Sequence, residues 1–342
     1  MIPNLLDPLT ERATPDSGAV FVFPGQGAEW FGPGHDWLPE SSPFADVIAR
    51  CDRAVQELAG WSVADVLRGD EGAPESVDVL QPALFAVMVG LAEQWRSCGI
   101  TPGAVVGHSQ GEVAAAVTAG ALTIEEGCRI VVGQSRALGL IEGLGAMASL
   151  SLSAPAAEEL LAVWPGEAAL AAVDGPTATV VSGTPEAVEG MLAWCRDNAV
   201  DGVSINVDYA SHWAQVDCVR DDVLEAVGPA SATTSVVPFY STVAGRRFDT
   251  AQLDGPYWFD NLRRTVLLEP VIRQLATEGF TAFVEISPRP VVAPSLKQTL
   301  EAAGAAAVVV GPSVPRDPEE PFSLSAESAR LATGVDVAHS GA

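Results

Sequence analysis

The chain has 342 residues, of which 48% are apolar, and this is enough to build a large core in one or two domains. Its formal net charge of -26 argues against binding to nucleic acid or to an anionic membrane, and the longest apolar run, at 83–92, is too short to span a bilayer. Five cysteines without metal-ligand spacing, and no signal peptide, lead us to expect buried thiols in a cytoplasmic protein.

The apolar pattern predicts strands and helices in alternation along the chain. In chain order these are a strand at 19–23, helices at 79–95 and 124–142, paired strands at 170–173 and 179–182, a helix at 185–199, and strands at 203–207, 236–241, 281–286 and 307–310. This alternation is typical of an α/β protein with a parallel sheet.

One serine stands on a glycine-flanked turn. Ser109 belongs to Gly-His-Ser-Gln-Gly at 107–111, between the apolar run at 104–106 and the helix-prone run at 113–117. A strand, a tight turn and a helix are the context of a nucleophile elbow, because glycine permits the strained backbone that leaves the hydroxyl exposed at the strand end. The turn also aims the backbone amide of Gln110 at the serine, which supplies half of an oxyanion hole.

A serine nucleophile needs a base, and the chain has four histidines. His339 lies in a polar tail, and His35 lies in a loop rich in glycine and proline. His108 is next to Ser109, but consecutive residues of an elbow point in different directions. His212, which follows the strand-like run at 203–207, is therefore the predicted general base, and a structural histidine is the alternative.

Several spaced motifs carry a family resemblance. They are FPGQGAEW at 23–30, QPALFA at 81–86, GHSQGE at 107–112, YASH at 209–212, VPFYST at 237–242 and YWFDNLR at 257–263. In this order, from about residue 20 to residue 311, the chain resembles the acyltransferases of modular polyketide synthases, which are relatives of malonyl-CoA:acyl-carrier-protein transacylase.

The resemblance implies roles for several residues. Ser109 would carry the acyl group and His212 would act as its base, in a ping-pong reaction in which a carrier-protein thiol attacks the acyl-serine ester. Gln26 would lie with Gln110 at the oxyanion hole. Gln81 would lie near the thioester. Family members have no triad aspartate, and a backbone carbonyl near the Asn of the YWxxNL motif orients the histidine; that residue is Asn261.

The resemblance also implies the architecture. We expect an α/β-hydrolase-like large subdomain with a parallel sheet at 1–146 and 208–311, a small ferredoxin-like subdomain at 147–207, and a C-terminal tail at 312–342. Ser109 and His212 would then meet across the cleft between the two subdomains.

One position departs from the family pattern. In members that load malonyl or methylmalonyl units, an arginine 25 residues after the serine holds the free carboxylate of the substrate, and here that residue is Gln134. Arg136 does not replace it, because two residues along a helix correspond to a rotation of about 200°. Since a desolvated carboxylate without a counter-ion is strongly disfavoured, Gln134 predicts an acyl group that lacks a free carboxylate. The alternative is neutral drift.

The YASH segment points to a different substrate. It resembles the motif of methylmalonyl-selective members, so Tyr209 and Ser211 would shape space for an α-methyl branch. Such a motif reports pocket volume, and a wrong volume costs only about 1–3 kcal/mol. We therefore give the charge at the arginine position priority. Trp213 stands where the family more often has a small residue, and it either changes the pocket wall or belongs to the core.

The expected partners are an acyl carrier protein and an acyl thioester, and phosphopantetheine arrives attached to them. No metal or other cofactor is implied, and we expect a monomer. Carrier proteins are usually acidic, so docking needs a local basic patch on this acidic chain. Arg263, Arg264 and Arg289 are the candidates, with solvated surface arginines as the alternative.

The resemblance and the departure together predict an acyltransferase of polyketide biosynthesis. It would move a non-carboxylated acyl group (aminoacyl, dipeptidyl or another starter) from a carrier-protein or CoA thioester through Ser109 to an acyl carrier protein. The first predicted strand begins at residue 19, which favours a free-standing enzyme, and free-standing family members include ones that pass aminoacyl or dipeptidyl starters between carriers. Loading acyltransferases for monocarboxylic starters also lack the arginine. The alternatives are a methylmalonyl-CoA:acyl-carrier-protein transacylase, an editing acyl hydrolase and an idle docking subunit.

Overall fold

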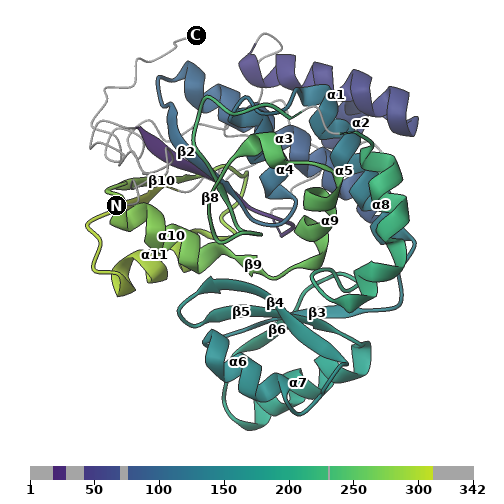
Figure 1. Cartoon of the computed structure of the whole chain (residues 1–342), viewed down its shortest axis with the longest axis vertical. Helices are drawn as coiled ribbons and strands as arrows, with labels where there is room; N and C mark the ends of the chain where they lie inside the picture. The colour runs from purple at the N-terminus through teal and green to yellow at the C-terminus, as the bar shows by residue number, and fades with distance from the viewer. Residues whose placement is uncertain (1–17, 28–41, 70–75, 230–231, 311–342) are drawn as a thin grey trace, which may run out of the picture.

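Two sheets organise the protein, and a computed structural model describes its residues 18–27, 42–69, 76–229 and 232–310. Figure 1 shows the smaller sheet and its two helices below the larger, helix-covered sheet, with β9 (Val266–Leu267) and α9 (Gly255–Arg263) between them. The fold is of the α/β class that the sequence predicts.

The larger sheet has the strand order β11-β10-β1-β2-β7-β8. Neighbouring strands are parallel except at the edge, where β8 pairs antiparallel with β7. The strands are β1 (Ala19–Phe23), β2 (Pro102–Gly107), β7 (Phe239–Ser241), β8 (Arg246–Phe248), β10 (Ala282–Glu285) and β11 (Val308–Val310). Parallel strands are joined by crossovers, so helices cover both faces of such a sheet.

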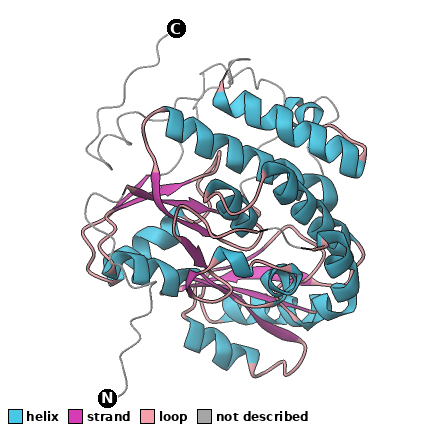
Figure 2. Cartoon of the chain, turned by 45° about the horizontal axis from the view of Figure 1, so that its top comes forward, coloured by secondary structure: helices cyan, strands magenta, loops and turns pink. Residues whose placement is uncertain are grey.

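The side chains of β1 alternate between two apolar cores. Phe21 and Phe23 pack with one group of helices, and Val20 and Val22 pack with α10 and α11 on the opposite face. Figure 2 shows helices on both sides of the strands. The helices on the first face are α1 (Pro43–Ala59), α2 (Val63–Arg68), α3 (Val77–Ser97), α4 (Gly111–Thr118), α5 (Ile124–Gly139), α8 (Arg220–Val227) and α9; those on the second are α10 (Leu268–Thr277) and α11 (Ala293–Ala302).

The smaller sheet has the order β6-β3-β5-β4-β9. Its elements are β3 (Ala146–Leu150), α6 (Ala154–Leu161), β4 (Ala168–Gly175), β5 (Ala178–Gly183), α7 (Pro185–Asp197) and β6 (Gly202–Ser204). This βαββαβ sequence with β3 and β5 in the centre is the ferredoxin-like arrangement. A separate core that includes Val181, Val188 and Met191 lies between the sheet and its helices.

β9 ties the small sheet to the rest of the chain. It lies outside 147–207 in sequence, yet it pairs in parallel with β4 through Ala172↔Val266 and Val173↔Leu267. The division of the chain at 146/147 and 207/208 stays a prediction, and the tail at 312–342 lies outside the described residues.

Most predicted elements differ from the observed ones only at their ends. The strand predicted at 203–207 is the clear error, because β6 ends at Ser204 and residues 205–208 form a turn into the site. The helix predicted at 124–142 ends at Gly139. Many elements were not predicted at all: the strands β3, β8 and β9, the helices α1, α2, α6, α8, α9, α10 and α11, and the two 3-10 helices Ala214–Val219 and Thr250–Gln252.

Two expectations from composition, on membrane-spanning segments and on the cysteines, can be compared with the structure. α3 is the one helix of the described residues that is long and apolar enough to cross a membrane, and 78% of its apolar window is buried in the protein. All five cysteines are free, and three are buried, but Cys98 is half-buried and Cys218 is exposed. The expectation of uniformly buried thiols was therefore wrong for Cys218, which lies on the surface of the 3-10 helix after His212.

Candidate active site

Ser109 lies on the turn between β2 and α4 and has a φ of 54°, in the left-handed region that non-glycine residues rarely adopt. The flanking glycines are required by close packing. A Cβ on Gly107 would lie 2.2 Å from the nitrogen of Glu112, and one on Gly111 would lie 2.2 Å from the carbonyl oxygen of Phe23. The turn therefore presents Ser109 at the N-terminus of α4, where the helix dipole favours negative charge.

His212 faces the serine from the loop after β6. The distance between Ser109 Oγ and His212 Nε2 is 2.9 Å, and His212 Nδ1 lies 2.8 Å from the carbonyl oxygen of Arg264. A carbonyl only accepts, so Nδ1 carries the proton and Nε2 is left as an acceptor for the serine hydroxyl. The orienting carbonyl belongs to Arg264, three residues beyond Asn261. The backbone of His212 is also left-handed, with a φ of 58°.

The environment of His212 keeps its imidazole neutral. The pKa of His212 is lowered to about 4, mainly by burial and also by the charge of His108, while the bond to the Arg264 carbonyl and the charge of Asp174 act in the opposite direction. A neutral imidazole with a free Nε2 lone pair is the form that removes a proton from a hydroxyl.

A buried carboxylate supports the elbow from below. Glu112, which is fully buried, accepts hydrogen bonds from the backbone and hydroxyl of Thr242, from Tyr257 and from Asn261. Burial raises the pKa of Glu112, and these donors oppose the increase. Asn261 also donates to the carbonyl oxygen of Ser109, at 3.0 Å. Sequence analysis assigned no role to Glu112, Thr242 or Tyr257.

Gln134 is fully buried on α5 beside this network. Its Nε2 donates to the carbonyl oxygen of Trp258 at 2.9 Å and lies 3.4 Å from Oδ1 of Asn261. Because the Trp258 carbonyl only accepts, the orientation of the amide is fixed, and Oε1 of Gln134 has no hydrogen-bond partner among the described residues. The side chain therefore offers a neutral acceptor. Arg136 points away and donates to the carbonyl oxygen of Leu58 near the surface.

A family model described as the acyl transferase domain matches residues 20–339. The chain belongs to this acyl transferase domain family.

Two curated relatives illustrate the match. Erythronolide synthase EryA2 of Saccharopolyspora erythraea is 45% identical over 341 residues, which cover 97% of this acyltransferase chain and 9% of that protein. Spectinabilin polyketide synthase system protein NorC of Streptomyces orinoci is 47% identical over 294 residues, which cover 85% and 13%. The chain thus spans a small part of the length of these relatives.

Solved structures agree with the fold over nearly the whole chain. The acyltransferase domain from module 8 of the salinomycin polyketide synthase is 42% identical with a TM-score of 0.88, and the match covers 94% of this chain and 77% of that one. A loading acyltransferase from the avermectin modular polyketide synthase is 38% identical with a TM-score of 0.83, and the match covers 88% and 97%.

The remaining predicted site residues of the acyltransferase differ in burial and in hydrogen bonding. Gln26 is half-buried and its Oε1 accepts from the Tyr209 hydroxyl at 2.7 Å. Ser211 is buried and its hydroxyl lies 3.4 Å from the sulfur of Met147, whereas Trp213 is half-buried at the start of a 3-10 helix. The roles proposed for these residues stay predictions.

Two further glutamines have unsatisfied amides. Both amide atoms of Gln110 and Oε1 of Gln81 are buried without a partner among the described residues. Buried polar groups are nearly always hydrogen-bonded in folded proteins, so these atoms have bonding capacity that a water or a ligand can fill. Within the described residues no group of three potential metal ligands occurs.

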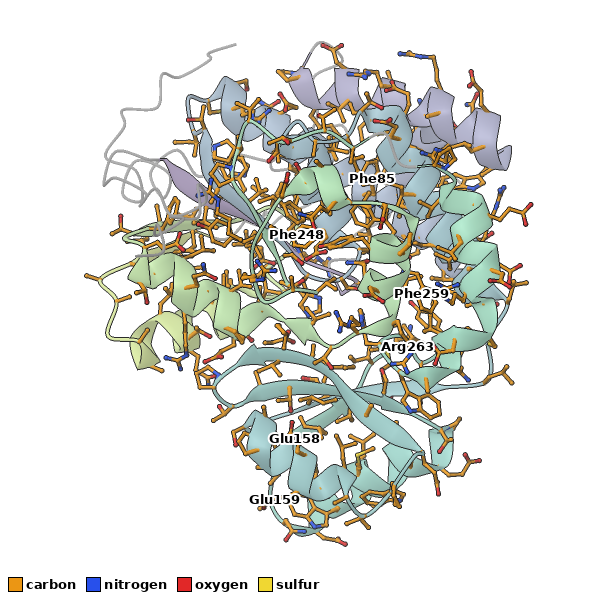
Figure 3. All side chains as sticks on the ribbon, in the orientation of Figure 1. Phe85, Glu158, Glu159, Phe248, Phe259 and Arg263 are labelled. Atoms are coloured by element: carbon orange, nitrogen blue, oxygen red, sulfur yellow. The ribbon has the colours of Figure 1, made fainter. Side chains whose placement is uncertain are left out.

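The predicted docking arginines are not equivalent. Arg263, labelled in Figure 3 between α9 and the small sheet, bonds Asp217 at 2.8 Å. Arg264 is largely exposed and lies 3.6 Å from Asp260, and Arg289 is exposed. Arg263 and Arg264 thus have acidic partners, and carrier docking stays a prediction for all three residues.

Proposed function

We propose that this chain is an acyltransferase that moves an acyl group without a free carboxylate from a thioester, through an ester on Ser109, to an acyl carrier protein. The observation that carries the substrate class is the fixed amide of Gln134, because its Nε2 is already bonded to Trp258 and only its oxygen is left to face a ligand.

The Ser109–His212 geometry supports the two-step chemistry. In the first step Ser109 Oγ attacks the thioester carbonyl, its proton passes to Nε2 of His212, and the departing thiol takes that proton as the C–S bond breaks. In the second step a carrier thiol gives its proton to His212 and attacks the ester; the C–O bond to Ser109 breaks as the C–S bond forms, and the serine oxygen takes the proton back from His212. The N-terminus of α4 stabilises the tetrahedral oxyanion in both steps.

Electrostatics at Gln134 favour an acyl chain that lacks a free carboxylate. An arginine offers a charged, two-pronged match to a carboxylate, whereas the unpartnered lone pairs of an amide oxygen repel one. Burial makes the difference larger, since a carboxylate there has lost its water and gains no counter-ion. Aminoacyl, dipeptidyl and simple monocarboxylic groups all satisfy this requirement. The likeness to a loading acyltransferase supports the same class.

Intact-protein mass spectrometry tests the proposal. Wild type and Ser109→Ala are incubated with methylmalonyl, propionyl and aminoacyl groups, each offered as a CoA thioester and as a carrier-protein thioester, and a second carrier protein is then added. We expect a Ser109-dependent adduct with the propionyl or aminoacyl group, which disappears as the carrier thiol becomes acylated.

Each other outcome identifies an alternative. Preferential loading of methylmalonyl would show a methylmalonyl transferase that tolerates Gln134, as the Tyr209–Ser211 motif suggests. An adduct that decays equally fast with and without carrier would show an acyl hydrolase. No adduct with any donor would favour a docking subunit. A monomeric state, a cytoplasmic location and the lack of a cofactor belong to the same proposal and stay predictions.

A further inference from the structure

The tip of the β4–β5 hairpin (residues 174–177) is held against the large subdomain by two side chains. Nε2 of His108, the residue before the nucleophile, lies 2.8 Å from Oδ1 of Asp174. Gln298 on α11 bonds both the hydroxyl and the backbone N–H of Thr177, at 2.6 and 3.2 Å. The small sheet is thus fixed directly to the elbow at one point and to α11 at another.

The same strand also reaches the support of His212. β4 pairs with β9, and the hydroxyl of Thr265 donates to the carbonyl oxygen of Leu170 on β4. Arg264, whose carbonyl orients His212, immediately precedes Thr265. Along its length β4 contacts the segment that holds the base, and at its end it contacts the residue beside the nucleophile.

The His108–Asp174 pair is shielded and electrostatically coupled to the base. The two side chains are 16% and 18% exposed, so solvent screens them weakly. Burial alone would lower the pKa of His108, but the charge and hydrogen bond of Asp174 outweigh it and the pKa is raised. The other charged group that acts on His108 is the buried Glu112. At His212 the charge of His108 lowers the pKa and that of Asp174 raises it.

We propose that His108 and Asp174 are positioning residues of acyl transfer: their ion pair fixes the small subdomain against the elbow and balances the charge next to His212. This inference rests on the proposed reaction through Ser109. Without His108, the Asp174 carboxylate would face His212 with no cation beside it and would favour the protonated, inactive base. Removal of both residues would take away both charges.

A fluorophosphonate probe tests this without an acyl donor. Ser109 Oγ attacks phosphorus, fluoride leaves, and the serine proton passes through His212 to solvent, so the labelling rate reports the dyad alone. The rate is measured from pH 4 to pH 8 for wild type, His108→Gln, Asp174→Asn and the double variant. Gln298→Ala is the matched control, since it removes the other attachment of the hairpin tip without a change in charge.

We expect His108→Gln to slow labelling about tenfold. The acid limb of its pH profile, which is the fall in labelling rate at low pH, should move to higher pH by about one unit, because a unit charge has been left unpaired beside His212. The double variant should return the limb toward the wild-type position, and Gln298→Ala should leave the limb unchanged. Asp174→Asn should lose rate without an upward shift. Unfolding midpoints, measured for every variant, establish that each remains folded.

The proposal would be overturned by equal acid limbs in wild type, His108→Gln and the double variant, or by single losses that simply add. If His108→Gln does not fold, an unchanged labelling rate for Asp174→Asn would overturn it, as would a wild-type chain that does not label. A chain that labels as expected but accepts no acyl donor would contradict the proposed function alone.

Discussion

Beneath the nucleophile, Glu112 receives four hydrogen bonds from Thr242, Tyr257 and Asn261, whereas on the neighbouring helix α5 Gln134 leaves Oε1 without a partner among the described residues. Both side chains are fully buried, and Asn261 contacts both of them. The reacting groups are thus held in place before substrate arrives. Gln134, which we propose meets the acyl chain, retains bonding capacity that a substrate would complete.

The largest expected effect is the loss of acylation rate when the predicted base, His212, is removed. His212→Ala removes the acceptor that lies 2.9 Å from Ser109 Oγ, so the acylation rate should fall by about 10²–10⁴-fold. The rate is measured in single turnover with the donor that loads wild type best. Glu158→Gln, an exposed change on α6 at the far end of the small subdomain in Figure 3, is the control. The smallest expected loss is about 100-fold, so a loss of less than about tenfold would exclude His212 as the base.

The next largest effect is a change of acyl preference when residue 134 gains a positive charge. Gln134→Arg places a guanidinium where the amide oxygen now lies, and a charge-assisted hydrogen bond to a carboxylate should raise the methylmalonyl-to-propionyl loading ratio by about 10- to 100-fold. Gln134→Met, which keeps the volume and adds no charge, should leave the ratio near the wild-type value. Equal ratios in all three proteins would mean that the acyl chain does not reach residue 134.

The site could be predicted from sequence wherever its parts are local. The elbow at 107–111 combines its strand, glycines and helix in one short segment, and His212 was one of only four histidines. Contacts between distant segments leave no such pattern. His108 was set aside because it cannot face Ser109, and Asp174 lies between the predicted strands at 170–173 and 179–182 without any assigned role, yet the fold brings them within 2.8 Å.

The identity of the orienting carbonyl shows a second limit. Resemblance indicated the neighbourhood of Asn261, but backbone carbonyls carry no residue-type signal, and the path of the chain after α9 selects Arg264. Similarly, sequence identified Gln134 as neutral, and only the bond to Trp258 shows which end of its amide is left over.

A third prediction concerns the contribution of the Glu112 hydrogen-bond network to stability. Both carboxylate oxygens of Glu112 accept hydrogen bonds, so Glu112→Gln turns an amide donor toward other donors whichever way it is oriented. The free energy of unfolding should fall by about 1–3 kcal/mol, measured by denaturant titration. Glu125→Gln removes an exposed carboxylate that is paired with Arg50 and should cost less than about 1 kcal/mol. Equal losses would show that the network contributes no more than a surface pair.

The smallest expected effect is the change in acylation rate between pH 7 and pH 5. Activity falls only where His212 becomes protonated, and burial lowers the pKa of His212 to about 4, so most of the base stays neutral at pH 5. A histidine with the ordinary pKa of about 6.5 would be almost entirely protonated there, and its rate would fall roughly thirtyfold. We expect a fall of less than about twofold in kcat/KM.

Stability also decreases toward acid pH, but it begins to do so at a higher pH than activity does, and this sets the control for the measurement. His212 stays neutral in the fold down to about pH 4, whereas the unfolded chain takes up that proton near pH 6.5, so stability decreases as the pH falls through this window. The unfolding midpoint is therefore measured at each pH, and rates are compared only where the protein is folded. A thirtyfold loss of kcat/KM at pH 5 in folded protein would mean that His212 is far better solvated than its burial next to the elbow implies.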